Sequence, residues 1–276
     1  MGMKVVVTGA AGRTGALVLK KLVASDKYEP RAVVRSEQSK AKVVGMGVKD
    51  TNVFFADVAA GRPSDYAKAF EGADAIVVAT SGVPQIVYFS LIAVFWAKLT
   101  GGAPARPQFT WKEGQMPEQV DWIGQKAQFD AAKAAGVKRV ILVGSMGGTQ
   151  PENPLNKLGD GNILMWKRKA EEYLIASGLD YTIIHPGGLK DDEGGARQLL
   201  LGVDDTLLER KERSIPREDV AELCVQCLAL PEASKRSFDV ISVAPEAAPP
   251  TTDFGALLAT LKGANCDYSI LSQEKL

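Results

Sequence analysis

Residues 9–15 contain three glycines at three-residue spacing, directly after a short run of valines. Val5–Val7 is β-branched and predicts a buried strand, while Gly15–Val23 has helical spacing and good helix-forming residues. Gly9, Gly12 and Gly15 form the turn between them. A glycine turn lets the backbone approach a phosphate group, and the N-terminus of the following helix offers free N–H groups and a partial positive charge. The segment therefore predicts a phosphate-binding turn, although its G-x-x-G-x-x-G spacing differs from the common G-x-G-x-x-G.

Short apolar segments alternate with helical patterns along the rest of the chain. Strands are predicted at Val5–Val7, Pro30–Val34, Asn52–Phe55, Ala75–Ala79, Arg139–Val143 and Tyr181–Ile184. Helices are predicted at Gly15–Val23, Val120–Ala135, Met165–Ser177 and Val220–Leu230. This alternation is typical of a doubly wound α/β fold of the Rossmann type, in which helices cover both faces of a parallel sheet. A ligand is then expected at the carboxyl ends of the strands.

The length of the chain, residues 1–276, suits one large α/β domain. Residues 187–218 are rich in Gly, Asp and Glu and show no clear periodicity. We expect this segment to form a small C-terminal lobe or lid on the substrate side of the domain.

The 33 basic and 33 acidic side chains give a net charge of zero, which argues against a nucleic acid as a partner. The three cysteines and the single histidine make neither a disulfide framework nor a recognisable metal pattern. Cys224-x-x-Cys227 is interpreted as part of a buried helix face, so no metal site is predicted. Because the first strand starts near residue 3, no targeting segment is expected and a cytoplasmic location is predicted. The plastid stroma is the alternative if a transit peptide has been removed.

Two arginines indicate which dinucleotide the turn binds. Arg35 follows the second strand, where an acidic residue favours NAD and an arginine pairs with the 2′-phosphate of NADP. Arg13 lies inside the glycine turn and can reach the same phosphate, with Ser36 as a further donor. Both arginines could instead be solvated surface residues, but their occurrence at two separately expected positions favours NADP.

Two further segments are candidates for cofactor contact. Asp57 follows the third strand and can accept a hydrogen bond from the adenine amino group, or can cap a helix instead. Small residues end the fourth strand at 79–82, where they leave room for a cofactor.

These motifs together resemble the atypical short-chain dehydrogenase/reductases, in particular the NmrA-like and plant or algal NAD(P)-binding branch. The resemblance rests on the segments Thr8–Gly15, Val33–Ser36, Asp130–Val140, Val143–Ser145 and His185–Gly187. It implies a Rossmann fold with an NADP cofactor. The residues implied to contact the cofactor are Thr8, Gly9, Gly12, Arg13, Thr14, Gly15, Arg35, Ser36, Asp57, Val58, Ala79, Thr80, Ser81, Gly82, Ser145, Lys169, His185, Pro186 and Gly187.

Members of this family that reduce carbonyl groups use a serine and a tyrosine that precedes a lysine by four residues. The resemblance makes Ser145 and Lys169 the candidate catalytic residues, but Met165 stands at the tyrosine position and cannot donate a proton. His185 has a pKa suited to proton transfer and could replace it. We favour a packing or ribose-contacting role for His185.

Two functions agree with this pattern. One is an NADP(H)-dependent oxidoreductase that acts on a small organic substrate. The other is a catalytically silent NADP(H)-binding sensor or scaffold, which the missing tyrosine favours.

Ile86–Leu99 is an unusually apolar segment after the fourth strand. As a helix it would be about 21 Å long, too short for a bilayer core of ~30 Å, so no transmembrane segment is predicted. Three interpretations are open: a buried helix that lines the substrate pocket, a docking surface for a protein partner, or a helix on a membrane surface. We favour the buried helix.

Overall fold

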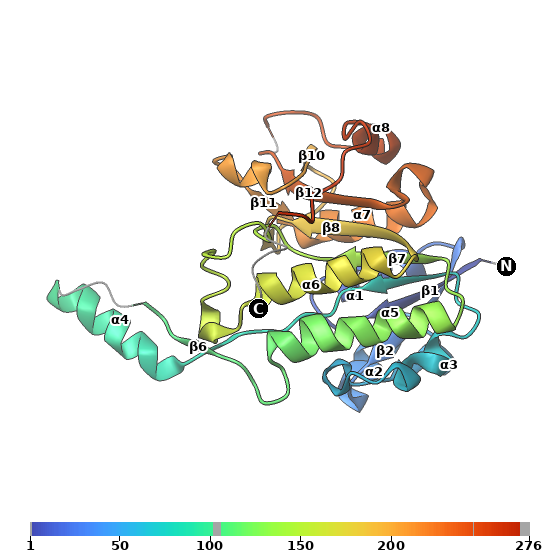
Figure 1. Cartoon of the computed structure of the whole chain (residues 1–276), viewed down its shortest axis with the longest axis horizontal. Coiled ribbons are helices and arrows are strands. Elements are labelled where there is room, and N and C mark those ends of the chain that lie inside the picture. The colour runs from blue at the N-terminus through green and yellow to red at the C-terminus, as the bar shows by residue number, and fades with distance from the viewer. Residues whose placement is uncertain (1, 102–105, 245, 271–276) are drawn as a thin grey trace.

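The computed structural model describes residues 2–101, 106–244 and 246–270, and its centre is an eight-stranded sheet (Figure 1). The strand order is β10-β12-β8-β7-β4-β1-β2-β3, and neighbouring strands are parallel except for β10 and β12. These strands are β1 (Met3–Thr8), β2 (Tyr28–Val34), β3 (Val53–Phe55), β4 (Ala75–Val78), β7 (Arg139–Val143), β8 (Asp180–Pro186), β10 (Leu199–Gly202) and β12 (Arg236–Ser242). The order reverses between β1 and β4, the point at which open α/β sheets bind ligands.

Helices cover both faces of the sheet (Figure 1). The longer ones are α1 (Gly15–Val23), α5 (Gly124–Ala134), α6 (Ile163–Ala176) and α7 (Arg217–Ala229), and the shorter ones are α2 (Glu37–Val44), α3 (Ala67–Phe70) and α8 (Phe254–Ala259). Val5 and Val7 of β1 join the core formed with α1 and α7, whereas Val6 joins the core formed with α5 and α6. Alternate residues of a strand point to opposite faces. Both faces of β1 are therefore buried, which explains its uninterrupted run of valines.

The predicted doubly wound parallel α/β fold is confirmed, and each predicted strand is present. The predicted helix Val120–Ala135 begins instead as a π-helical turn at Glu118–Ile123, and α6 begins two residues before the predicted Met165. The sequence pattern misses β12, because this strand reads RSFDVIS and its buried Asp239 hides the apolar signal.

Residues 187–218 do not form one separate unit. Within them, β10 completes the edge of the main sheet, while β9 (Gly188–Lys190) and β11 (Ser214–Pro216) form a small parallel sheet of their own. A 3-10 turn at Thr206–Glu209 lies between β10 and β11. The expectation that this segment lies on the substrate side stays a prediction.

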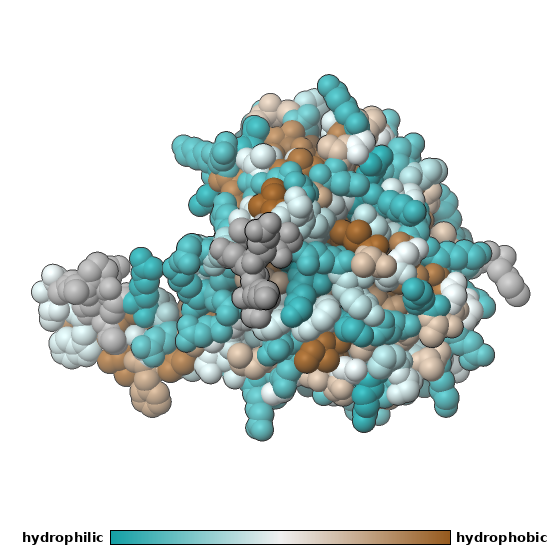
Figure 2. Space-filling view, in the orientation of Figure 1, coloured by the Kyte–Doolittle hydropathy of each residue, from teal (hydrophilic) through white to brown (hydrophobic). Residues whose placement is uncertain are grey.

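The apolar segment Ile86–Leu99 forms most of α4 (Tyr88–Thr100), which projects from the body of the molecule at the left of Figure 1. It starts just after β5 (Gln85–Ile86), which pairs with β6 (Phe109–Thr110). Its large apolar side chains are exposed, and Figure 2 shows hydrophobic side chains on this arm. The favoured interpretation of a buried helix is therefore wrong, because the helix packs too little against the sheet to be covered. Among the described residues, no helix is both long and apolar enough to cross a membrane.

Candidate functional site

The glycine turn between β1 and α1 brings backbone segments too close together for side chains. Gly9 has a φ of +66°, and a Cβ added there would lie 2.5 Å from the carbonyl oxygen of Ala79. A Cβ on Gly15 would collide with the carbonyl oxygen of Gly9, which already accepts a hydrogen bond from the Gly12 N–H at 2.8 Å. The buried hydroxyl of Thr8 has no hydrogen-bond partner among the described residues. The turn thus has the open backbone and the unpaired polar atom expected of a phosphate cradle.

A cavity of about 900 Å³ opens at the carboxyl ends of β1, β4, β7 and β8. Its position at the topological switch point is where a doubly wound fold binds its ligand. The predicted site residues that line it are Thr14, Ala79, Thr80, Ser81, Ser145, Pro186 and Gly187. Apolar side chains, among them Trp111 and Leu158, form much of the remaining wall. The cavity can therefore hold an elongated ligand along its polar wall and an apolar molecule against Trp111 and Leu158.

Lys167, and not the predicted Lys169, is the lysine of α6 that lines this cavity. Its ammonium forms a buried ion pair with Asp121 at 2.8 Å, and the other carboxylate oxygen of Asp121 accepts a hydrogen bond from the Gly82 N–H. Lys169 instead places its ammonium over the rings of Trp122 and Trp166, at 5.2 and 5.0 Å from their centres. The structure thus places Lys167 in the cavity wall and Lys169 outside it, and the predicted role of Lys169 stays a prediction.

Two glutamines of α5 form hydrogen bonds with Thr80, just after the end of β4. Gln125 donates a hydrogen bond to the Thr80 carbonyl at 2.9 Å, and Gln128 donates one to the Thr80 hydroxyl at 3.3 Å. Both glutamines are buried and follow the π-helical turn that carries Asp121. Such π-turns are frequent at functional sites. The cavity wall at 80–82 is therefore fixed by polar contacts that the sequence pattern does not reveal.

Ser145 follows β7 and faces the same cavity, with its hydroxyl 3.1 Å from the Met146 carbonyl. The loop after it is held by Asp205, whose carboxylate accepts hydrogen bonds from the N–H groups of Gly147 and Thr149 and from the Thr149 hydroxyl. Asp205 itself has a φ of +62°, an uncommon backbone conformation for a side chain of this kind. Asp205, which lies in the segment 187–218, thus positions the loop that follows Ser145.

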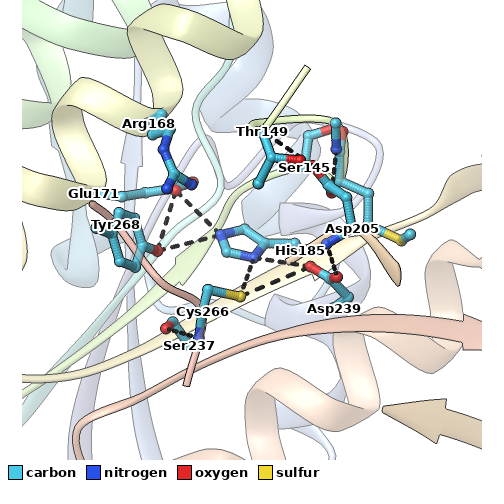
Figure 3. Close-up of polar contacts among 12 residues, drawn as sticks. Ser145, Thr149, Arg168, Glu171, His185, Asp205, Ser237, Asp239, Cys266 and Tyr268 are labelled. Atoms are coloured by element: carbon cyan, nitrogen blue, oxygen red, sulfur yellow. Dashed lines mark hydrogen bonds and ion pairs between the residues drawn. The ribbon is translucent and has the colours of Figure 1, made fainter. Parts of the chain in front are cut away.

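His185 does not line the large cavity, since its side chain lies in a buried polar cluster behind the Ser145 loop (Figure 3). Its Nε2 is 3.1 Å from Glu171 and its Nδ1 is 3.3 Å from Asp239. Burial disfavours the charged imidazole, but the Glu171 and Asp239 carboxylates outweigh it and hold the pKa of His185 well above its usual value. Tyr268 donates a hydrogen bond to Glu171 from the other side. The favoured packing role for His185 agrees with this arrangement.

The remaining predicted residues lie around the glycine turn. Arg13 pairs with Asp191, and Arg35 is exposed directly after β2, with no ion pair to the described residues. Ser36 caps α2 by accepting a hydrogen bond from the Ser39 N–H. Asp57 caps the 3-10 turn that begins at Val58.

A second cavity of about 640 Å³ adjoins the same turn and is lined by Gly12, Arg13, Lys42 and Arg217 among others. Arg13 is thus the predicted cation that lines this cavity, together with the carboxylates of Asp191, Asp192, Glu193 and Glu218.

The fold and the cavity define a Rossmann-type dinucleotide-binding protein. A model of the NAD(P)H-binding family matches residues 9–231. The chain belongs to this family, and the resemblance to the atypical short-chain dehydrogenase/reductases is confirmed. The predicted nicotinamide dinucleotide cofactor is confirmed with it.

Several relatives match most of the chain, and two of them are plant proteins at 44–50% identity. The protein At2g37660 of Arabidopsis thaliana, which is named as uncharacterized and chloroplastic, is 50% identical over 256 residues, covering 92% of this chain and 74% of its own. Sanguinarine reductase of Eschscholzia californica is 44% identical over 269 residues, covering 93% of this chain and 95% of its own. A solved structure from Bacillus halodurans, a putative NAD-dependent epimerase/dehydratase, matches with a TM-score of 0.71 at 25% identity, over 94% of this chain and all of that one.

Proposed function

We propose that this protein is an NADP(H)-dependent reductase of a small organic substrate. The observation that carries the proposal is the convergence of Thr14 from the glycine turn, the end of β4, Ser145 and Lys167 on one cavity. The relative named sanguinarine reductase supports reduction as the reaction type.

The residues present fit a dinucleotide phosphate. The backbone at Gly9 and Gly15 has no room for a Cβ, so no side chain there covers the backbone N–H groups that would bind the pyrophosphate. The Thr8 hydroxyl just before the turn is also unpaired among the described residues. Arg35 would hold the 2′-phosphate together with Arg13, so NADP is preferred over NAD. Thr80 and Ser81 line the part of the cavity next to the sheet, where the nicotinamide ribose would lie beside Lys167.

The cavity lining includes the carboxyl side chains of Asp204, Asp205 and Glu209, but not the tyrosine that carbonyl reductases of this family use as the proton donor. Of the described residues that line it, none is a tyrosine or a histidine, and Ile163 stands four positions before Lys167. Bound NADPH supplies a hydride. A carbonyl that accepts a hydride becomes an alkoxide and needs a proton, whereas an iminium carbon becomes a neutral amine without one. We therefore favour substrates with an iminium group, with Ser145 orienting the polar end and the apolar wall holding the rest.

The test is reduction by purified protein with NADPH. Sanguinarine and panels of iminium, carbonyl and enone compounds are supplied, and loss of NADPH absorbance is followed. We expect turnover with an iminium compound, and a lower kcat for Ser145→Ala with an unchanged dissociation constant for NADPH. Tight NADPH binding without turnover of any compound would reject the reductase.

We also propose the plastid stroma as the compartment, with the cytoplasm as the alternative. The support is the chloroplastic relative at 50% identity. Imaging of the fluorescently tagged product of the full gene in plant or algal cells decides between them, because a stromal protein overlaps with chlorophyll fluorescence and a cytoplasmic one surrounds it.

A second candidate function is that of an NADP(H)-binding scaffold without catalysis. The exposed apolar side chains of α4 favour it, since Phe95 and Trp96 are 63% and 56% exposed and aromatic residues are enriched at protein interfaces. A protein partner would dock on this helix. If Phe95→Glu with Trp96→Glu leaves every co-purifying protein bound, the scaffold is rejected.

A further inference from the structure

Three potential metal ligands from distant parts of the chain converge behind the Ser145 loop (Figure 3). His185 belongs to β8, Asp239 belongs to β12, and Cys266 follows α8. All three are buried, with exposed fractions of 4%, 1% and 7%. Nδ1 of His185 is 3.3 Å from Oδ1 of Asp239 and 3.6 Å from Sγ of Cys266, and Sγ is 3.9 Å from Oδ1. Each of the three atoms is therefore in contact with both others.

The two separations from Nδ1 match the edges of a zinc coordination sphere, and the separation of 3.9 Å between Sγ and Oδ1 is slightly longer than such an edge. Zinc lies about 2.0–2.1 Å from nitrogen, about 2.3 Å from sulfur and about 2.0–2.2 Å from oxygen, so tetrahedral ligands lie about 3.3–3.6 Å apart. A histidine, a carboxylate and a thiol are all side chains that bind zinc in proteins, and here one ligand atom of each lies within reach of the other two. We propose that His185 Nδ1, Asp239 Oδ1 and Cys266 Sγ form a zinc-binding site.

The surroundings orient these ligand atoms as a metal site requires. Nε2 of His185 lies 3.1 Å from the Glu171 carboxylate, which keeps a proton on Nε2 and leaves Nδ1 for the ion. Oδ2 of Asp239 accepts a hydrogen bond from the Asp205 N–H at 2.7 Å, so Oδ1 is the oxygen turned toward the other ligands. Contacts of this kind fix the tautomer of a histidine and the orientation of a carboxylate around zinc.

A void of about 10 Å³ adjoins all three ligand residues and is also lined by Ser145 and Thr149. Its volume is that of about one water-sized probe, so one water can complete a four-coordinate site. Binding displaces the thiol proton of Cys266 and any proton on Nδ1, and both pass to the solvent. Zinc undergoes no redox change, so no further reactant is needed.

The site joins the paired strands β8 and β12 to the C-terminal stretch, which already donates the Cys266 N–H to the Ser237 carbonyl. Cys266 lies in the C-terminal stretch 264–270, which also places Tyr268 against Glu171. An ion at this point ties that stretch to β8 and β12, directly behind the loop of Ser145. We assign it a structural role, separate from the reductase proposal.

The test uses the full chain, freed of metal by a chelator in reducing buffer and titrated with Co²⁺ and then Zn²⁺. We expect one Co²⁺ per chain with a near-ultraviolet thiolate-to-cobalt absorption band, and loss of that band as Zn²⁺ displaces cobalt. A thermal upshift on zinc addition should accompany binding. Absence of the thiolate-to-cobalt band in the unmodified protein overturns the proposal.

Variants identify the ligands. Cys266→Ser should abolish the band, while Cys227→Ser, which alters another buried free thiol, should keep it. Glu171→Gln should keep the band but weaken zinc binding by about 10–100-fold, because Glu171 acts through His185. Persistence of the band in Cys266→Ser overturns the assignment. The readouts do not require reductase activity, so this proposal and the proposed function fail independently.

Discussion

Lys167 and Asp121 form an ion pair of 2.8 Å between side chains that are only 8% and 0% exposed. Asp121 also accepts a hydrogen bond from the Gly82 N–H at 2.8 Å, so the pair connects α6 to the chain just after β4. Both charges are removed from water, and each depends on the other for compensation. The pair therefore shapes the cavity wall and places an ammonium group there.

We expect Lys167→Met to lower the free energy of unfolding by about 3–5 kcal/mol, because it leaves the Asp121 carboxylate buried without its partner. Addition of Asp121→Asn should recover much of this loss by removing the uncompensated charge. Urea unfolding of the single and double variants measures both effects.

The same variants test which lysine of α6 contacts the cofactor. The Lys167→Met, Asp121→Asn double variant should bind NADPH more weakly than the unmodified protein, since it lacks the cavity ammonium. Lys169→Met is the matched control, as its ammonium lies over two indole rings outside the cavity lining. A larger loss of NADPH affinity in Lys169→Met than in the double variant would favour Lys169 as that contact.

The different positions of Lys167 and Lys169 have a simple geometric source. Residues two apart on an α-helix point about 200° away from each other. The face of α6 turned to the core is set by Leu164, Ala170 and Leu174, which are buried against the sheet. A motif read along the sequence gives the helix but not its rotation, so Lys167 and Lys169 could be separated only by packing.

Local patterns were sufficient for the glycine turn and the strands, because backbone geometry and burial on both faces constrain those residues directly. They were not sufficient for the His185 cluster. Its partners lie far along the chain, with Asp239 54 residues after His185 and Cys266 a further 27 residues on. No short spacing reveals such a site, and only the pairing of β8 with β12 brings the first two together.

Arg35 decides the choice of cofactor in our proposal. Hydrogen bonds to charged groups contribute about 1.5–3 kcal/mol, so Arg35→Asp should weaken NADPH binding by roughly 10–100-fold. An aspartate there can also accept from the 2′-hydroxyl of NAD, so NADH binding should improve. Fluorescence titration with each cofactor measures the ratio of the dissociation constants for NADH and NADPH. Lys138→Ala removes an exposed cation next to the opposite end of the sheet and should leave it unchanged.

We expect Asp191 to compete with the cofactor for Arg13. Its carboxylate pairs with Arg13 and with Arg217, at 2.6 Å in the latter case, and the Arg13 hydrogen bond lowers the pKa of Asp191. Exposed ion pairs of this type contribute little, so Asp191→Asn should tighten NADPH binding by only about 1.5–5-fold. Asp192→Asn is the control, because Asp192 pairs with Arg197 instead. Weaker NADPH binding in Asp191→Asn would show that the carboxylate supports the site rather than competing for it.

The exposure of α4 can be tested through stability. Phe95 and Trp96 are 63% and 56% exposed, so Phe95→Glu with Trp96→Glu should change the free energy of unfolding by no more than about 0.5 kcal/mol per site. Phe129→Ala on α5 removes a fully buried aromatic and should cost about 3–5 kcal/mol in the same urea experiment. NADPH binding should be unchanged in the α4 variant, since neither aromatic lines the cavity. A loss of several kcal/mol in that variant would instead mean that α4 is packed against the body of the protein, as the sequence alone suggests.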